Sequence, residues 1–595
     1  MKTSTLALSL SILLLITSCS APSPAVPPTT APSAAPSATP LSDEAALLAT
    51  IAANAPSPAD ATPTVPLPTP FPTITLGPTA EPRPLPEGWW DTAVCYEIFV
   101  RSFYDSNGDG IGDLNGLIAK LDYVNDGDPT GGSDLGATCI WLMPVAEAAS
   151  YHGYDVIDYY AIEKDYGTND DFKRLVEEAN RRGIRVIVDL VLNHTSSAHP
   201  WFISALNDPA SPYRDWYIWS PVDPGYRGPW GQQVWHRSPA RNEYYYGVFV
   251  AEMPDLNYRN PAVVAEAEKI AAFWLNEMGV DGFRLDAIKH VVENGSEQEG
   301  TRETHAWMRA FEAAIERIKP GTFTVGEVFG GRAGSLAAYY PDQLDTYFEF
   351  GVAEGILRSA NTGAPGPYLT AVEEALTRLP YQRWAPFLTN HDQERVMTVL
   401  GGDVGKARVA ATALLTLPGL PFVYYGEEIG MSGAKPDERI RTPMQWTGEP
   451  GAGFTTGSPW QAPQSDFPTV NVAAQNADPG SLLNVYRTLI RLHTTRPALG
   501  EGDFTALNAT RGAAAFLRCS GDDAVMVIIN FSASPLSGVT LSTARSSLIP
   551  GVYTPDLLFG SGNLPPLTAG ADGSISAYAL PEIPPQSALI VGLGR

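Results

Sequence analysis

From about residue 89 to about residue 490, short runs of β-branched and aromatic residues alternate with stretches in which apolar residues recur at helical spacing. The helical stretches include 170–182, 262–278, 304–318 and 406–415. Eight apolar runs are predicted to be strands, at 94–103, 138–145, 185–193, 280–288, 323–329, 344–350, 384–390 and 420–425. Apolar strands that alternate with helices predict a parallel sheet, and eight repeats predict an α/β fold of the (β/α)8 TIM-barrel type.

Two departures from this alternation predict further domains. The gap between the third and fourth predicted strands is the longest, and residues 195–258 within it are rich in Tyr, Trp, Pro and Gly. We expect these residues to form a small inserted domain, so that the barrel comprises 89–194 and 259–490. After about residue 490 the pattern changes to short alternating strands, which predicts that 491–595 fold as an antiparallel β-sandwich.

Residues 1–88 differ in composition from the rest of the chain. Lys2 precedes a short apolar stretch, and the following Ile-Thr-Ser-Cys19 is similar to a bacterial lipobox. Residues 1–18 are therefore predicted to be a lipoprotein signal peptide, with Cys19 as the lipidated N-terminus; the alternative is ordinary cleavage and secretion. Cys19 begins a linker to residue 88 that is rich in Pro, Ala, Ser and Thr and holds 18 of the chain's 53 prolines, as in an extended tether. We expect a globular body anchored on the outer side of the bacterial cell membrane.

Charge and cysteine content limit the possible partners. The 595-residue chain has a formal net charge of −26, which argues against nucleic acid because phosphate contacts need a surplus of Lys and Arg. Four cysteines rule out a disulfide-stapled scaffold. Cys95 and Cys139 lie in the first two predicted strands and are expected to be buried thiols, although neighbouring strands would allow them to pair. Whether these two or Cys519 form a disulfide is left open, as is the oligomeric state.

Polar residues follow four of the predicted strands at their carboxyl ends, where a barrel places its active site. Arg284 and Asp286 are two apart on a strand and share a face, so the guanidinium would hold the carboxylate ionised and oriented. A single such residue is more often a helix cap or a core contact, but four strand ends in order on one face indicate chemistry. The residues are Asp189, Asn193 and His194; Arg284 and Asp286; Glu327; and His391 and Asp392.

These segments resemble the α-amylase family of retaining, α-glucan-active glycoside hydrolases, over about residues 90–595. The matching motifs, in the family's order, are 189–194, 282–290, 326–328 and 390–392, together with 136–145 for the second strand, 253–257 near the end of the inserted domain and 419–427 for the eighth strand.

The resemblance implies a reaction with two carboxyl groups and a covalent intermediate. Asp286 would be the nucleophile, and Glu327 the acid and base, with a raised pKa that keeps it protonated near neutral pH. Asp392 would hold sugar hydroxyls, and Asp189 would organise the rim. The residues expected to bind substrate are Arg284, which orients Asp286; His194 and His391 at the same sugar; Tyr154 as the aromatic platform below it, with His152 beside it; and Lys289 and His290 on the leaving-group side.

An oxygen-rich loop at 105–113 suits a hard cation. It is not an EF-hand, because the twelfth position is Gly116 rather than Glu. It resembles the family's Ca²⁺ loop, and the alternative is a turn without an ion. The implied ligands are Asp105, Asn107, Asp109, the Ile111 carbonyl and Asp113. A second Ca²⁺, absent in some relatives, would be held by Asn193, Asp255 and the His290 carbonyl.

Motifs around the site point to different substrates. Lys289-His290 resembles α-amylases that act on α-1,4 links, whereas 253–257 is similar to neopullulanases and cyclodextrin-degrading enzymes, and 441–446 to α-glucosidase-like and trehalose-converting members. Export favours a substrate met outside the cell, so we predict an α-amylase acting on starch-like glucans and maltooligosaccharides. Alternatives are a neopullulanase, cyclomaltodextrinase or α-glucosidase-like hydrolase, a 4-α-glucanotransferase, and a non-catalytic glucan-binding protein. Endo or exo action, chain-length preference and α-1,6 tolerance are left open.

Overall fold

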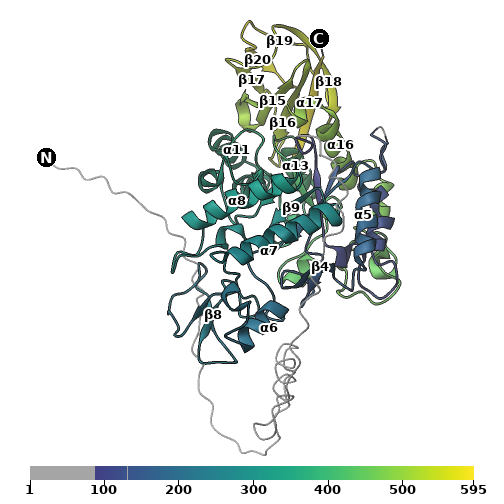
Figure 1. Ribbon diagram of the computed structural model, residues 1–595. Coiled ribbons are helices and arrows are strands. Elements are labelled where there is room, and N and C mark those ends of the chain that lie inside the picture. Colours follow the sequence, from purple (N-terminus) through teal and green to yellow (C-terminus); the bar gives the residue numbers. More distant parts are fainter. Residues whose placement is uncertain (1–87, 130, 595) are drawn as a thin grey trace, which may run out of the picture. The chain divides into compact units, whose positions relative to one another are not determined.

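A computed structural model describes residues 88–129 and 131–594 (Figure 1). The predicted signal peptide, Cys19 and most of the tether lie outside the described residues. No helix in the described part of the chain is long and apolar enough to cross a membrane.

The centre of the fold is a curled parallel sheet of seven strands in the order β11-β10-β9-β5-β2-β1-β12. Their carboxyl ends carry the residues that the sequence singles out. The strands are β1 (Cys95–Ile98), β2 (Cys139–Leu142), β5 (Arg185–Leu190), β9 (Gly282–Leu285), β10 (Phe323–Gly326), β11 (Thr346–Tyr347) and β12 (Phe422–Tyr424).

The predicted strand at 384–390 closes the barrel without forming a regular strand. The amide of Ala385 donates to the Tyr347 carbonyl in β11, and the Pro386 carbonyl accepts from the amide of Phe422 in β12. The segment therefore lies between these two strands. Proline has no amide hydrogen, so Pro386 leaves a gap in the ladder on one side.

Helices lie outside the strands, with α5, α7 and α8 visible around β9 in Figure 1. Each of these three helices has an N-cap side chain, such as Thr168, which accepts the amide of Asp171 at the start of α5. The longer helices are α5 (Asn169–Arg181), α6 (Pro200–Asn207), α7 (Pro261–Ala272, continued by a π-helical turn to Glu277), α8 (Arg302–Ile318), α10 (Phe350–Thr362), α11 (Gly366–Arg378), α13 (Val404–Leu415) and α16 (Leu482–Thr495).

Between β5 and α7 the chain forms the predicted insert. It contains α6 and a three-stranded sheet, β6 (Trp219–Ser220), β8 (Tyr244–Tyr246) and β7 (Trp235–Arg237), with its own small core around Val234 and Tyr246. A bridge between His194 and Asp255 ties the end of the insert to the end of β5. A separate hairpin, β3 (Ala146–Ala148) and β4 (Val156–Ile162), carries Tyr154 in its turn.

The C-terminal part is a two-sheet antiparallel sandwich. Its sheets have the orders β13-β15-β16-β21-β18-β19 and β14-β17-β20, and share a core that includes Leu517, Met526 and Leu541. The predicted fold class is therefore confirmed. The strands are β13 (Thr505–Ala506), β14 (Asn508–Ala509), β15 (Ala514–Ser520), β16 (Asp523–Asn530), β17 (Thr540–Thr543), β18 (Gly551–Phe559), β19 (Leu567–Ala569), β20 (Ile575–Ala579) and β21 (Ser587–Gly594).

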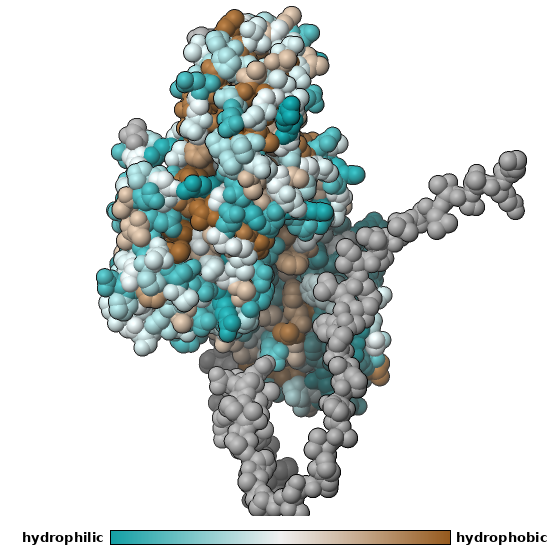
Figure 2. Space-filling view, turned by 180° about the vertical axis from the view of Figure 1, so that it is seen from behind, coloured by the Kyte–Doolittle hydropathy of each residue, from teal (hydrophilic) through white to brown (hydrophobic). Residues whose placement is uncertain are grey.

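Cys95 and Cys139 occupy paired positions on β1 and β2 and form a buried disulfide, which settles the pairing that the sequence left open. Cys519, in β15, is a free thiol. On the face shown in Figure 2, hydrophilic and hydrophobic residues are interspersed over the surface.

Candidate active site

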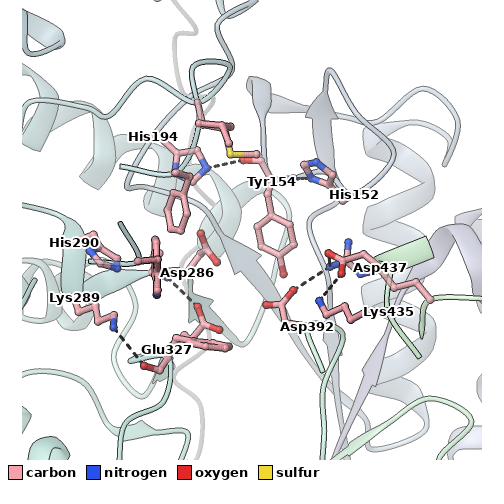
Figure 3. A pocket seen from close by; sticks show the side chains of 17 residues that line it. His152, Tyr154, His194, Asp286, Lys289, His290, Glu327, Asp392, Lys435 and Asp437 are labelled. Carbon is pink, nitrogen blue, oxygen red and sulfur yellow. Dashed lines mark hydrogen bonds and ion pairs between the residues drawn. The ribbon is translucent and has the colours of Figure 1, made fainter. Parts of the chain in front are cut away.

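A cavity of about 530 Å³ opens at the carboxyl ends of the barrel strands (Figure 3). Its walls come from the β3–β4 turn, the insert, the ends of β5, β9 and β10, and the long segment after β12. The lining residues are His152, Tyr154, His194, Trp230, Phe249, Val250, Met253, Asp286, Ala287, Lys289, His290, Glu327, Phe329, Asp392, Lys435, Asp437 and Arg441.

One buried guanidinium gathers three carboxylates at the base of this cavity. Nη1 of Arg284 lies 2.6 Å from Oδ1 of Asp286 and 2.8 Å from Oδ1 of Asp189, while Nη2 lies 3.0 Å from Oε1 of Glu327. Arg284 has no exposed surface, so water does not compete for its hydrogens. This planar, always-charged group therefore fixes Asp286 and Glu327 relative to one another. The contact with Asp286 is the one expected from their shared strand face.

Glu327 has the environment of an acid. Burial raises the pKa of its carboxyl and the negative charge of Asp286 adds to the effect, although the Arg284 cation opposes both. The direction agrees with our prediction from the sequence. A Glu327 with a raised pKa beside an arginine-paired Asp286 places a candidate proton donor and a candidate nucleophile in one cavity.

His391 links the cavity to a residue that the sequence did not single out. Its Nδ1 lies 2.6 Å from Oε1 of Glu97, a buried residue of β1, and its Nε2 lies 3.2 Å from Oδ2 of Asp392. Burial disfavours the imidazolium, but Asp392 and Glu97 outweigh burial and raise the pKa of His391 to about 10. In turn, the cation on His391 helps to hold the pKa of Asp392 well below its usual range, even though burial acts in the opposite direction.

Tyr154 connects this histidine to the arginine cluster. Its hydroxyl donates to Oδ2 of Asp189 at 3.0 Å and lies 2.6 Å from Nε2 of His391, over which its ring is stacked. The Tyr154 carbonyl accepts from Nε2 of His194, and its amide donates to Nδ1 of His152. Tyr154 thus contacts all three histidines, and Lys289 and His290 also line the cavity.

A chain of ion pairs extends from Asp392 along one wall. Nη2 of Arg441 lies 3.0 Å from Asp392 Oδ1 and 2.9 Å from Asp437 Oδ2, and Asp437 also pairs with Lys435. In the sequence, Arg441 stood out only as part of a family motif, and Asp437 did not stand out at all. Glu97 was missed too, although an acid inside the apolar run that starts at Val94 was a usable signal.

The 105–113 loop is a series of side-chain turns. Oδ1 of Asp105 accepts the Asn107 amide, Asn107 accepts the Asp109 amide, and Asp109 accepts the Ile111 amide. Asp113 caps α3 (Leu114–Ala119). Both Asp105 oxygens are also bonded to neighbouring groups, whereas Asn107 and Asp109 are exposed. Within residues 88–129 and 131–594, no group of three or more His, Cys, Asp or Glu is arranged to hold a metal.

The residues of the possible second metal site have unsatisfied oxygens. Oδ1 of Asn193 and Oδ2 of Asp255 are buried and have no hydrogen-bond partner among the described residues. Burial raises the pKa of Asp255 well above its usual range. Buried acceptors without donors are rare unless an ion or water completes them, so these two side chains fit a cation.

Comparison of the chain with known proteins identifies a family whose members match most of it. A family model described as the alpha amylase catalytic domain matches residues 97–502. "Alpha-amylase 3" of Dictyoglomus thermophilum is 41% identical over 453 residues, which cover 75% of this chain and 86% of that protein. "Oligo-1,6-glucosidase" of Parageobacillus thermoglucosidasius is 33% identical over 526 residues, covering 75% and 90%. Among solved structures, the alpha-amylase from H. orenii matches with a TM-score of 0.74 at 40% identity and covers 84% of this chain and 99% of that one. The chain therefore belongs to the α-amylase family and is a retaining glycoside hydrolase.

Proposed function

We propose that this protein hydrolyses α-1,4-glucosidic bonds in starch-like glucans and maltooligosaccharides. The observation that carries the proposal is the cluster around Arg284, where an ion-paired Asp286 and a Glu327 with raised pKa share one cavity. The two relatives named alpha-amylases, at 41% and 40% identity, support the α-1,4 preference.

The reaction that this geometry supports has two steps. In the first, Asp286 attacks the anomeric carbon and the glycosidic C–O bond breaks, while Glu327 gives its proton to the leaving oxygen. In the second, the Glu327 carboxylate takes a proton from water, which displaces Asp286 and regenerates both groups. Asp392, kept ionised by His391 and Arg441, would hold hydroxyls of the reacting sugar and oppose the positive charge of the transition state.

Products from starch, maltotriose, pullulan and a cyclodextrin, separated by chromatography, test the proposal. We expect α-1,4 cleavage of starch with the α-anomer released first. Panose from pullulan would favour a neopullulanase, and longer oligomers from maltotriose a glucanotransferase. If wild type and Glu327→Gln bind glucan alike and neither releases sugar, the protein is a binding protein.

An α-glucosidase-like hydrolase is the second candidate, favoured by the 33% identity to an oligo-1,6-glucosidase and by the position of Arg441 in the cavity wall. Isomaltose and maltose as separate substrates distinguish the two. Faster release of glucose from isomaltose would support the second candidate.

We also propose that the protein binds Ca²⁺ at the 105–113 loop, through Asp105, Asn107, Asp109, Ile111 and Asp113. The loop carries oxygen donors at alternating positions, as a hard cation requires, and in this structure the side-chain oxygens of Asp105, Asn107 and Asp109 accept backbone amides of the same loop. The ion would tie this loop together and take no part in bond breaking. A second Ca²⁺ would be held by Asn193, Asp255 and the His290 carbonyl. Metal analysis of the purified protein, with Asp109→Ala as the variant, tests the first site.

For location, we propose a lipid anchor at Cys19 on the outer side of the membrane. The Cys95–Cys139 disulfide supports export, because disulfides form and persist in oxidising compartments. Replacement of Cys19 by Ser should abolish incorporation of labelled palmitate and release the protein from the membrane fraction. Unchanged labelling would refute the anchor.

A further inference from the structure

The two sides of the cavity differ in chemistry. Glu327, Lys289 and His290 lie on one side in Figure 3, and His152, Lys435 and Asp437 on the other, with Tyr154 and Asp286 between them. Because Glu327 protonates the leaving oxygen, its side receives the part of the chain that leaves. The opposite side receives the sugar that becomes bonded to Asp286 and whatever precedes it.

Apolar surface gathers on the leaving-group side. Trp230 of the insert is 52% exposed and Phe329, two residues beyond Glu327, is 44% exposed. Trp230 stacks on Phe249 with ring centroids 5.6 Å apart and lies 5.4 Å from the His290 ring. Exposed apolar side chains that line a cavity mark a binding surface, and aromatic faces suit the C–H faces of sugar rings. This side can therefore hold several glucose units.

The other side is charged. Beyond Asp392 the wall is the ion-pair chain through Arg441 and Asp437 to Lys435. Side-chain exposure rises along it from 3% for Arg441 to 47% for Lys435, so its outer members can still bond to a ligand. Asp437 offers acceptors and Lys435 offers donors, a pair that matches a free hydroxyl, which both donates and accepts.

A terminal and an internal glucose differ in whether the 4-oxygen is a free hydroxyl. The 4-oxygen of a terminal, non-reducing glucose is a free hydroxyl, whereas that of an internal glucose is a glycosidic oxygen without a hydrogen and with another sugar attached. A site that bonds this hydroxyl discriminates against a ligand that lacks it, because the bond is lost and the wall would also have to accommodate the attached sugar.

We infer that the cavity recognises the non-reducing end of an α-glucan. One terminal glucose binds between Tyr154 and the Asp437–Lys435 wall, the rest of the chain lies along Trp230 and Phe329, and each turnover releases a single glucose. This inference rests on the proposed α-1,4 activity and specifies its substrate as a chain end.

The test compares two maltoheptaosides that carry a chromophore at the reducing end, one with a free non-reducing end and one blocked there by a 4,6-ethylidene group. With the full-length protein, we expect kcat/KM for the blocked substrate to be at least tenfold lower. The free substrate should first give glucose and a labelled product one glucose shorter. A difference below tenfold, or several labelled fragments at the earliest times, would overturn the inference while leaving the α-1,4 activity intact. If neither substrate is cleaved, both the proposed activity and the inference built on it fail.

Asp437→Ala provides an internal test of the wall. The substitution should reduce kcat/KM for the free substrate. The ratio of kcat/KM for the free substrate to kcat/KM for the blocked substrate should move at least fivefold closer to one. Arg439→Ala, in the same short helix α14 (Asp437–Ile440) but with a side chain outside the cavity, is the matched control and should keep the ratio. A merely structural loss in Asp437→Ala would slow both substrates equally, and an unchanged ratio would refute the role of this wall.

Discussion

Glu97→Gln tests the electrostatics of the site without touching a group that contacts substrate. Glu97 is 1% exposed and faces Nδ1 of His391 at 2.6 Å, while Asp392 faces Nε2. The substitution keeps a carbonyl oxygen that accepts the Nδ1 hydrogen but removes one of the two negative charges. We therefore expect His391 to remain hydrogen-bonded and to lose part of its preference for the charged form.

The size of the effect follows from the distance. Two unit charges about 4 Å apart attract by about 4 kcal/mol at an effective dielectric constant near 20, or about three pH units. Because Asp392 and the new carbonyl remain, we expect the pKa of His391 to fall from about 10 to roughly 8, worth about 2.7 kcal/mol. His391 stabilises the fold fully below its unfolded pKa of 6.5, and this contribution is lost as pH rises to about 10. The variant should therefore be less stable at pH 7, and the pH-dependent part of the difference should vanish above about pH 10.

The assay is a pH titration of the histidine ring signals by NMR. The chain has 8 histidines, and His391→Asn identifies the signal of interest. Melting temperatures of wild type and variant at pH 7 and pH 10 give the stability difference. A His391 signal that titrates near 6.5 in the wild type, or the same pKa in both proteins, would refute the reasoning.

Three further changes have expected outcomes. Glu327→Gln should lower kcat on maltotriose by about 10²–10⁴-fold with little change in melting temperature, and a smaller loss would argue against its role as acid. Arg284→Leu leaves three carboxylates without their cation and should destabilise the protein by about 3–5 kcal/mol in calorimetry, so an unchanged melting temperature would contradict the ion-pair cluster. Removing Ca²⁺ with a chelator should lower the melting temperature of the wild type by more than that of Asp109→Ala, which keeps only the second site, and equal shifts would count against the 105–113 loop.

The sequence predicted the structure where a short local pattern specifies the element. Continuous apolar runs and helical spacing predicted the strands and helices of the barrel, because its strands are buried on both faces and its helices on one. The residues at the ends of β5, β9 and β10 were found because parallel strands deliver their carboxyl ends to one rim. The failure at 384–390 has a local cause as well, since the apolar run contains Pro386, which cannot complete a strand ladder.

What the sequence could not decide depends on contacts between distant segments. Asp437 and Arg441 lie in a segment without periodicity after β12, and only the folded chain brings them to Asp392, 45 and 49 residues away in sequence. Glu97 meets His391 across 294 residues, and Cys95 meets Cys139 because β1 and β2 pair in that register. By itself, the sequence determined the barrel, its two additional domains and the candidate reacting carboxyls, since these depend on local periodicity and short motifs. The charges that set the protonation of those carboxyls, and the contrast between the two cavity walls, were decided by tertiary structure, because electrostatic and packing interactions depend on distance in space.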